Sequence, residues 1–193
     1  SIINIIYGSF VNGIPLDYEA LVTFIWNLLP LDEAFDALSL ITYQNLTVAQ
    51  IVIQNKDTIF EWLNDPEYIK NALILINSLV RHNNMDIQTE IVPYVTEFLQ
   101  LSQTLDTDNL PILYSILKYF TNTKGLSKIK DYEMLGTLFD RAFESPDVFF
   151  EALRFVEEVN KCVSDPILFM DKANALIFFE KSLNSEDKKI FKE

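Results

Sequence analysis

The chain has 193 residues, of which 49% are hydrophobic, and its formal net charge at pH 7 is −13. This composition excludes intrinsic disorder, and the length suits one domain with a sizeable core. An acidic surface repels phosphate backbones, so the charge disfavours nucleic acid as a partner.

Apolar residues recur at steps of three and four along most of the chain, a spacing typical of amphipathic α-helices. Two faces of this kind are Ile69–Leu73–Ile76–Val80 and Phe149–Leu153–Val156–Val159. The short run Gln50–Ile53 is the nearest candidate for a strand. In chain order, the pattern predicts helices over residues 2–10, 17–29, 32–42, 47–63, 66–82, 87–103, 108–121, 129–143, 146–162, 166–182 and 185–191.

Helix starts are predicted where a side chain that can accept a hydrogen bond precedes a proline. A proline at the first helical position has no N–H to leave unpaired, and Ser or Asp before it accepts from a following N–H. Three pairs fit this pattern, namely Asp65-Pro66, Ser145-Pro146 and Asp165-Pro166. Further candidate caps are Thr47, Asp86, Asp108 and Ser185, and Asn83-Asn84 predicts a break.

The predicted connections are two to eight residues long, which makes successive helices antiparallel neighbours. Pro146 and Pro166 lie 20 residues apart in the sequence, and Pro66 and Pro146 lie 80 apart. One helix pair for every ~40 residues is the period of a helical solenoid. We therefore predict one all-α domain over residues 1–193, built as a short solenoid of stacked antiparallel helix pairs. A compact helical bundle is the alternative architecture.

One part of the chain resembles a known family of helical repeats. Residues 71–80 (NALILINSLV) resemble the last helix of an armadillo repeat, and residues 85–92 (MDIQTEIV) resemble the start of the next unit. The resemblance implies a HEAT- or armadillo-like scaffold that binds other proteins. In armadillo repeats, an asparagine clamps the backbone of a bound peptide. When the apolar positions are aligned, Ser78 occupies that position here and Asn77 lies one residue earlier.

The start of the chain and its single cysteine bear on its context. The sequence begins at Ser1 rather than Met, so we interpret it as part of a longer protein. No apolar stretch approaches the roughly 20 residues of a membrane span, so we expect none. Cys162 is the only cysteine, which excludes an internal disulfide and suits a reducing compartment. We expect an intracellular protein, cytoplasmic or nuclear.

Residue types that perform catalysis or bind metals are sparse. His82 and Cys162 are each the only residue of their type, whereas a zinc site needs three or four such ligands. We interpret His82 as a polar residue at a helix end and Cys162 as a small, partly buried side chain. The acidic group Asp32, Glu33 and Asp36 is interpreted as a solvated first turn of a helix. The chain contains no phosphate-binding or nucleophile motif, so we expect neither an enzyme nor a cofactor.

Two groups of residues are candidates for binding a partner. Trp62 and Tyr68 flank a predicted turn, where each is either a core residue or an exposed anchor. A basic stretch from Lys118 to Lys130 interleaves lysines with aromatic residues, and it is either a solvated loop or a site for an acidic peptide, phosphate or RNA. The candidate partner-binding residues are Trp62, Tyr68, Asn77, Lys124, Lys128 and Lys130.

The sequence as a whole predicts a non-enzymatic scaffold or adaptor domain. The acidic balance favours a basic or amphipathic segment of another protein as its partner. Two alternatives remain open: a structural or oligomerisation domain of a larger protein, and a helical domain that binds RNA through the stretch from Lys118 to Lys130.

Overall fold

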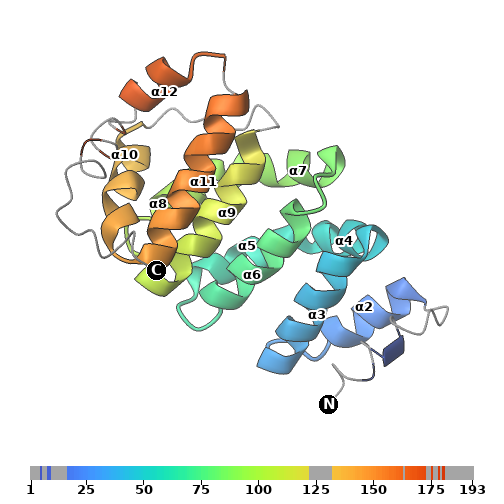
Figure 1. Cartoon of the computed structure of the whole chain (residues 1–193). Helices are drawn as coiled ribbons and strands as arrows, with labels where there is room; N and C mark the ends of the chain where they lie inside the picture. Colours follow the sequence, from blue (N-terminus) through green and yellow to red (C-terminus); the bar gives the residue numbers. More distant parts are fainter. Residues whose placement is uncertain are drawn as a thin grey trace. The chain divides into compact units, whose positions relative to one another are not determined.

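The computed structural model describes residues 5, 8, 9, 17–121, 132–162, 164–172, 175, 178 and 180. Over these residues every regular element is a helix, so the all-α prediction is confirmed and the strand candidate Gln50–Ile53 is helical instead (Figure 1). The chain separates into two compact units, Ser1–Ile91 and Val92–Glu193. The assignment of residues 1–193 to one domain stays a prediction.

The helices described in the first unit are α2 (Tyr18–Trp26), α3 (Asp32–Gln44), α4 (Leu46–Val52), α5 (Lys56–Glu61), α6 (Ile69–Val80) and α7 (Met85–Ile91). Among them, α3 packs extensively on α6. At the starts of the two helices, Asn71 donates a 3.1 Å hydrogen bond to Asp32. Near their ends, His82 Nε2 contacts the carbonyl oxygen of Thr42. Because start meets start and end meets end, α3 and α6 run parallel.

Asparagines define two helix starts that the sequence pattern placed slightly later. Asn45 Oδ1 accepts from the N–H of Val48, at 3.1 Å, and caps α4 in place of the predicted Thr47. Asn84 Oδ1 accepts from the N–H groups of residues 86 and 87, so Asn84 takes the capping position predicted for Asp86. Asparagine and threonine are both good N-cap residues, so residue type alone does not show which of two nearby residues caps the helix. The backbone conformation decides it.

Two long helices predicted from the sequence are each interrupted. The helix predicted over 47–63 consists of α4, a 3₁₀ turn at Ile53–Asn55, and α5. The helix predicted over 87–103 is broken by a 3₁₀ turn at Val92–Tyr94. Pro93 lies in that turn, and proline cannot donate the backbone hydrogen bond that a continuous helix requires.

The predicted break at Asn83-Asn84 is confirmed, whereas the predicted start at Pro66 is wrong. Asn83 adopts a φ of 49°, a left-handed conformation that stops α6. At the other end, residues 66–68 form a turn and α6 begins at Ile69. Asp65 Oδ1 accepts from the N–H of Glu67 at 2.9 Å, a turn geometry rather than a helix cap.

The helices described in the second unit are α8 (Val95–Leu101), α9 (Leu110–Phe120), α10 (Tyr132–Asp140), α11 (Pro146–Cys162) and α12 (Pro166–Lys172). Helices α9 and α11 lie side by side (Figure 1). Just before their starts, Thr107 donates a 2.6 Å hydrogen bond to Glu144. Farther along, the rings of Tyr114 and Phe155 have centroids 6.1 Å apart. These contacts make α9 and α11 parallel.

The core of the second unit is a cluster of aromatic rings. Phe139 lies 5.9 Å from Phe155 and 5.6 Å from Phe178, measured between ring centroids. Tyr114, which is fully buried, adds its ring and donates a 2.7 Å hydrogen bond to the carbonyl oxygen of Leu138. Buried Tyr hydroxyls need such a partner, so this bond lets a polar atom lie inside the core.

Candidate functional site

The longest described helix, α11, has two apolar faces. Its first face is buried against the core of the second unit and contains Val148, Phe149, Ala152, Phe155 and Val159. The second face contains Phe150, Leu153 and Val156, each of which directly follows a buried residue of the first face. Phe150 is 47% exposed, and Leu153 and Val156 are half-buried. Steps of three residues place these side chains along one line. An unburied apolar line on an otherwise packed helix is a candidate contact surface.

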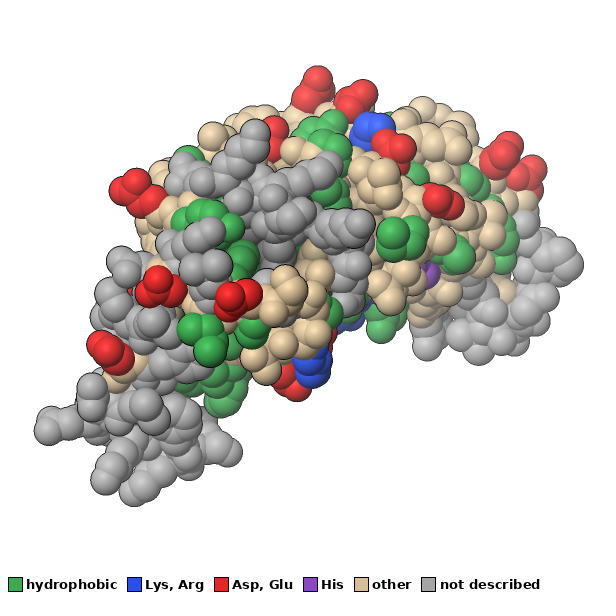
Figure 2. Space-filling view, turned by 90° about the horizontal axis from the view of Figure 1, so that it is seen from above, with side chains coloured by type: hydrophobic (Ala, Val, Ile, Leu, Met, Phe, Trp, Pro, Cys, Tyr) green, Lys and Arg blue, Asp and Glu red, His purple; other side chains and the backbone are tan. Residues whose placement is uncertain are grey.

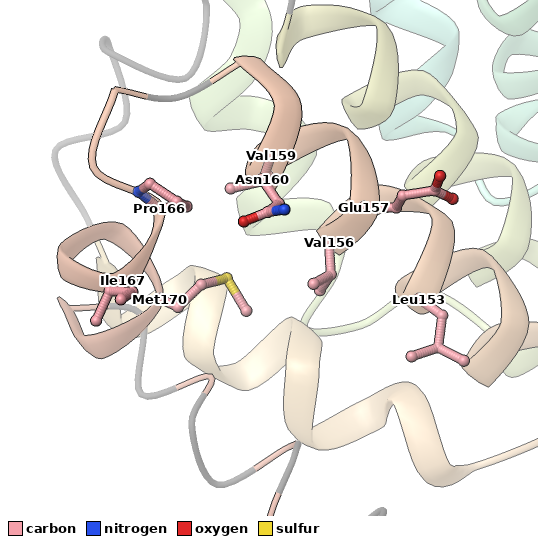
Figure 3. Close-up of a pocket in the computed structure, with 8 residues that line it drawn as sticks. All are labelled: Leu153, Val156, Glu157, Val159, Asn160, Pro166, Ile167 and Met170. Atoms are coloured by element: carbon pink, nitrogen blue, oxygen red, sulfur yellow. The ribbon is translucent and has the colours of Figure 1, made fainter.

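This second face opens into a groove between α11 and α12. The groove has a volume of about 380 Å³. Its lining is mainly apolar and consists of Leu153, Val156, Glu157, Val159, Asn160, Pro166, Ile167 and Met170. In Figure 3, Met170 reaches from α12 toward Val156 on α11, and Asn160 lies near Pro166 at one end. Ile167 is 74% exposed at the rim, a large apolar side chain left in water.

The sequence explains locally where the two helices of the groove begin. Ser145 Oγ accepts from the N–H of Val148 at 3.3 Å, and Pro146 follows it, so α11 starts at the predicted residue. The chain then turns, and Pro166 begins α12, also as predicted. Both helices therefore begin at a proline, the residue whose missing N–H suits the first helical position.

Acidic side chains outnumber basic ones around the groove. Residues 146–172 contain six Asp or Glu and three Lys or Arg, a net charge of −3. Lys161 lies 2.8 Å from Glu157 and 3.0 Å from Glu158, and its hydrogen bond holds the pKa of Glu157 below its ordinary value. Figure 2 shows acidic side chains spread over the visible face of the molecule, with few basic ones among them. Of the residues that line the groove, Glu157 carries a negative charge, and the sequence of α11 and α12 is acidic overall, which suits a cationic partner.

The two aromatic residues predicted to bind a partner lie together in the first unit. Trp62 and Tyr68 are both half-buried, and both contact Phe35, at ring-centroid distances of 5.0 and 6.2 Å. They are neither fully buried nor free anchors, because each packs on the core and retains some exposed surface.

The other predicted binding residues are less informative. Asn77 is half-buried on α6, and its Oδ1 atom is buried without a hydrogen-bond partner among the described residues. Lys124, Lys128 and Lys130 lie outside the described residues. Lys118, at the start of the same basic stretch, lies 5.3 Å from the centroid of the Tyr119 ring. The structure brings Trp62 and Tyr68 together and leaves Asn77 as a separate position.

The residues considered for catalysis or metal binding take ordinary positions. Cys162 is exposed at the end of α11, so the prediction that it is partly buried is wrong. It follows the last residue of the buried face by three positions, but the helix ends there and leaves the thiol in water. Within the described ranges, no three or more His, Cys, Asp or Glu side chains are grouped to hold a metal ion. None of the helices in the described ranges has both the length and the apolar character that crossing a membrane requires.

The groove is not apparent from the sequence alone. The spacing of Phe149, Leu153, Val156 and Val159 predicts one core face, whereas Leu153 and Val156 line the groove. The available signal was Phe150, which extends the apolar positions of α11 beyond the width of one face.

The chain has no detectable similarity to known proteins at the level of sequence families, curated proteins or solved structures.

Proposed function

We propose that the chain is a non-enzymatic protein-binding module whose α11–α12 groove holds a basic amphipathic helix of a partner protein. The main support is the groove, where an apolar floor lies between two helices whose sequence has a negative net charge. Partner helices bind in such grooves by inserting apolar side chains at helical spacing. Lysine or arginine on the flanks of that helix would be attracted by the net negative charge of α11 and α12, which also steers the encounter.

The proposed architecture is a set of helix-pair repeats of the HEAT or armadillo kind within each unit. In the first unit, α3 and α6 run parallel, and their linked residues lie 39 and 40 positions apart in the sequence. In the second unit, Thr107 and Glu144 link the segments just before α9 and α11 and lie 37 positions apart, and Ser102 and Arg141 link the segments after α8 and α10 and lie 39 positions apart. One helix, α10, lies between α9 and α11, and the interrupted helix α4–α5 lies between α3 and α6. Parallel stacking at this interval is typical of solenoids, in which each pair buries its faces against the next.

The proposal can be tested with a reporter built into the groove region. Cys162 is the only cysteine and is exposed, so an environment-sensitive dye can be attached there alone. The probe is a synthetic helical peptide with leucines on one face and lysines on the other, compared with a version in which glutamates replace the lysines. We expect the lysine peptide to bind at least tenfold more tightly at low salt, because its charge complements the net negative charge of α11 and α12.

Amino-acid substitutions distinguish binding in the groove from nonspecific binding elsewhere on the protein. Ile167→Asp and Leu153→Asp should each weaken binding of the lysine peptide at least fivefold. Met85→Asp is the matched control, since Met85 is 62% exposed on α7 in the first unit. Equal binding of both peptides, or equal loss in Ile167→Asp and Met85→Asp, would exclude the groove as the site. A micromolar dimer that Ile167→Asp dissociates would instead favour the oligomerisation role.

A further inference from the structure

The first unit has a second surface, made of aromatic rings and distinct in its residues from the groove. Trp26 ends α2 and Trp62 follows α5, and their ring centroids lie 5.5 Å apart with the planes tilted by 34°. Phe35, 1% exposed, packs with its ring edge-on to Trp62. Tyr68 stacks on Phe35 with an angle of 29° between the ring planes. Trp26, Trp62 and Tyr68 remain half-buried, so each keeps part of its surface accessible to solvent.

Carboxylates surround the tyrosine end of this surface. Burial raises the pKa of the Tyr68 hydroxyl, and the negative charges of Glu67, Asp65 and Asp32 raise it further, in that order. The three carboxylates are therefore close enough to act on one phenol. All three residues are exposed, so a ligand in water can reach them.

The charge of the surrounding sequence has the same sign. Residues 17–70 contain nine acidic side chains and two basic ones, a net charge of −7. The negative net charge of this segment, which contains the aromatic residues, therefore attracts cations. Phosphate groups and acidic peptides would be repelled by the same charge.

We propose that the surface formed by Trp26, Trp62 and Tyr68, with the flanking carboxylates, binds an arginine side chain of a partner protein. The planar guanidinium group stacks on aromatic faces, and it donates paired hydrogen bonds to carboxylates in a fixed geometry. Both kinds of partner are present here within one cluster. Lysine, a compact and strongly hydrated charge, would use the carboxylates but gain less from the rings. The inference does not depend on the groove, because it concerns different residues.

The chain provides its own probe for this surface. Trp26 and Trp62 are its only tryptophans, so intrinsic tryptophan fluorescence reports on this cluster alone. The ligand for the test is a short glycine peptide that carries two arginines, and the control peptide carries citrulline in their place. Citrulline keeps the shape of arginine and removes its charge. Neither peptide has an apolar side chain to enter the groove, so the result is independent of the first proposal.

We expect a saturable fluorescence change with the arginine peptide and at least tenfold weaker binding with the citrulline peptide. The double variant Asp65→Asn, Glu67→Gln should weaken arginine binding at least fivefold. Asparagine retains the oxygen that accepts from the N–H of Glu67, so the turn is preserved. Glu97→Gln, an exposed carboxylate on α8, is the control and should bind like the unaltered chain.

Two outcomes would overturn the proposal. One is equal binding of the arginine and citrulline peptides, which would show that the charge has no role. The other is an unchanged affinity in the double variant while its circular dichroism and thermal unfolding match those of the unaltered chain. A lysine peptide that binds more tightly than the arginine peptide would also contradict the stacking on which the proposal depends.

Discussion

Arg141 donates a 2.7 Å hydrogen bond from Nη1 to the backbone carbonyl oxygen of Ser102, 39 positions earlier in the chain. The same guanidinium group holds Glu144 through Nε, at 2.6 Å, and Nη2, at 2.8 Å. Glu144 in turn accepts from Thr107. One planar cation thus links the segment after α10 to the segment after α8, and its carboxylate partner links the starts of α9 and α11.

Replacing Arg141 with alanine should destabilise the chain more than replacing Glu144 with glutamine. The alanine variant leaves the Ser102 carbonyl without this donor, and loss of a hydrogen bond to a charged group costs about 1.5–3 kcal/mol. Glutamine keeps an oxygen that can accept from Thr107 and Arg141, so its effect should be smaller. Urea unfolding at pH 7 measures both, and a larger effect of Glu144→Gln would show that Ser102 is not the important partner.

The Arg141–Glu144 pair should also make stability depend on acidity. The hydrogen bond from Arg141 lowers the pKa of Glu144 below 4.5 in the folded state. The unfolded chain therefore binds the proton first as pH falls, and the stabilisation present above pH 4.5 is lost as pH drops through the lowered value. The stability difference between the unaltered chain and Glu144→Gln should accordingly shrink between pH 6 and pH 3. A constant difference over that range, measured by denaturant unfolding, would contradict this.

Tyr114 should weaken the fold at alkaline pH. Burial raises the pKa of its hydroxyl well above 10.0, and the nearby Arg141 opposes this only in part. Above pH 10 the unfolded chain therefore releases a proton that the folded chain keeps, so stability falls as pH rises. Tyr114→Phe should cost about 1 kcal/mol at pH 7 through the lost bond to Leu138, yet decline less between pH 9.5 and 11. Parallel declines in the two proteins would rule out this group as the cause.

The cap at α4 offers a direct comparison between two neighbouring residues. Asn45→Ala should destabilise the chain by about 1 kcal/mol, because an N–H at the start of the helix loses its acceptor. Thr47→Ala should have little effect, since the exposed Thr47 is not the cap. Thermal unfolding of both variants measures the difference. A larger decrease in the unfolding temperature for Thr47→Ala than for Asn45→Ala would show that Thr47 caps α4, as the sequence pattern predicted.

Ile167 should be dispensable for folding even though it is apolar. With 74% of its surface exposed, it contributes little buried area, so Ile167→Asp should change the free energy of unfolding by less than about 0.5 kcal/mol. Phe155→Ala, in contrast, should cost about 3–5 kcal/mol, because it opens a cavity among packed rings. Denaturant unfolding of both variants checks the pair. A severe loss in Ile167→Asp would mean that the groove is part of the folded core.

The sequence predicted helix content well where local signals were sufficient. Helix α11 spans Pro146–Cys162, the range expected from Ser145, the proline and the apolar spacing that follows them. The apolar spacing predicts one helix over 87–103, although Pro93 lies inside this range. The helix is interrupted there because proline lacks the backbone N–H that a continuous helix requires. The choice between Asn45 and Thr47 could not be made from residue type, since both are good caps.

The candidate sites were harder to predict than the helices. Leu153 and Val156 have the same spacing as core residues, and only the position of α12 makes them the floor of a groove. Trp62 and Tyr68 were identified by their place beside a turn. Their contact with Phe35 depends on the packing of α3 beside them, which no local pattern specifies.

The parallel pairing of α3 with α6, and of α9 with α11, has a consequence for how the chain acquires its structure. The residues that these pairs join lie 37 to 40 positions apart, so each link closes a chain loop of modest length. Closing loops of similar length costs a similar entropy in each unit, because this cost grows only slowly with loop length. We expect the first ninety residues to reach their own contacts while the rest of the polypeptide is still leaving the ribosome.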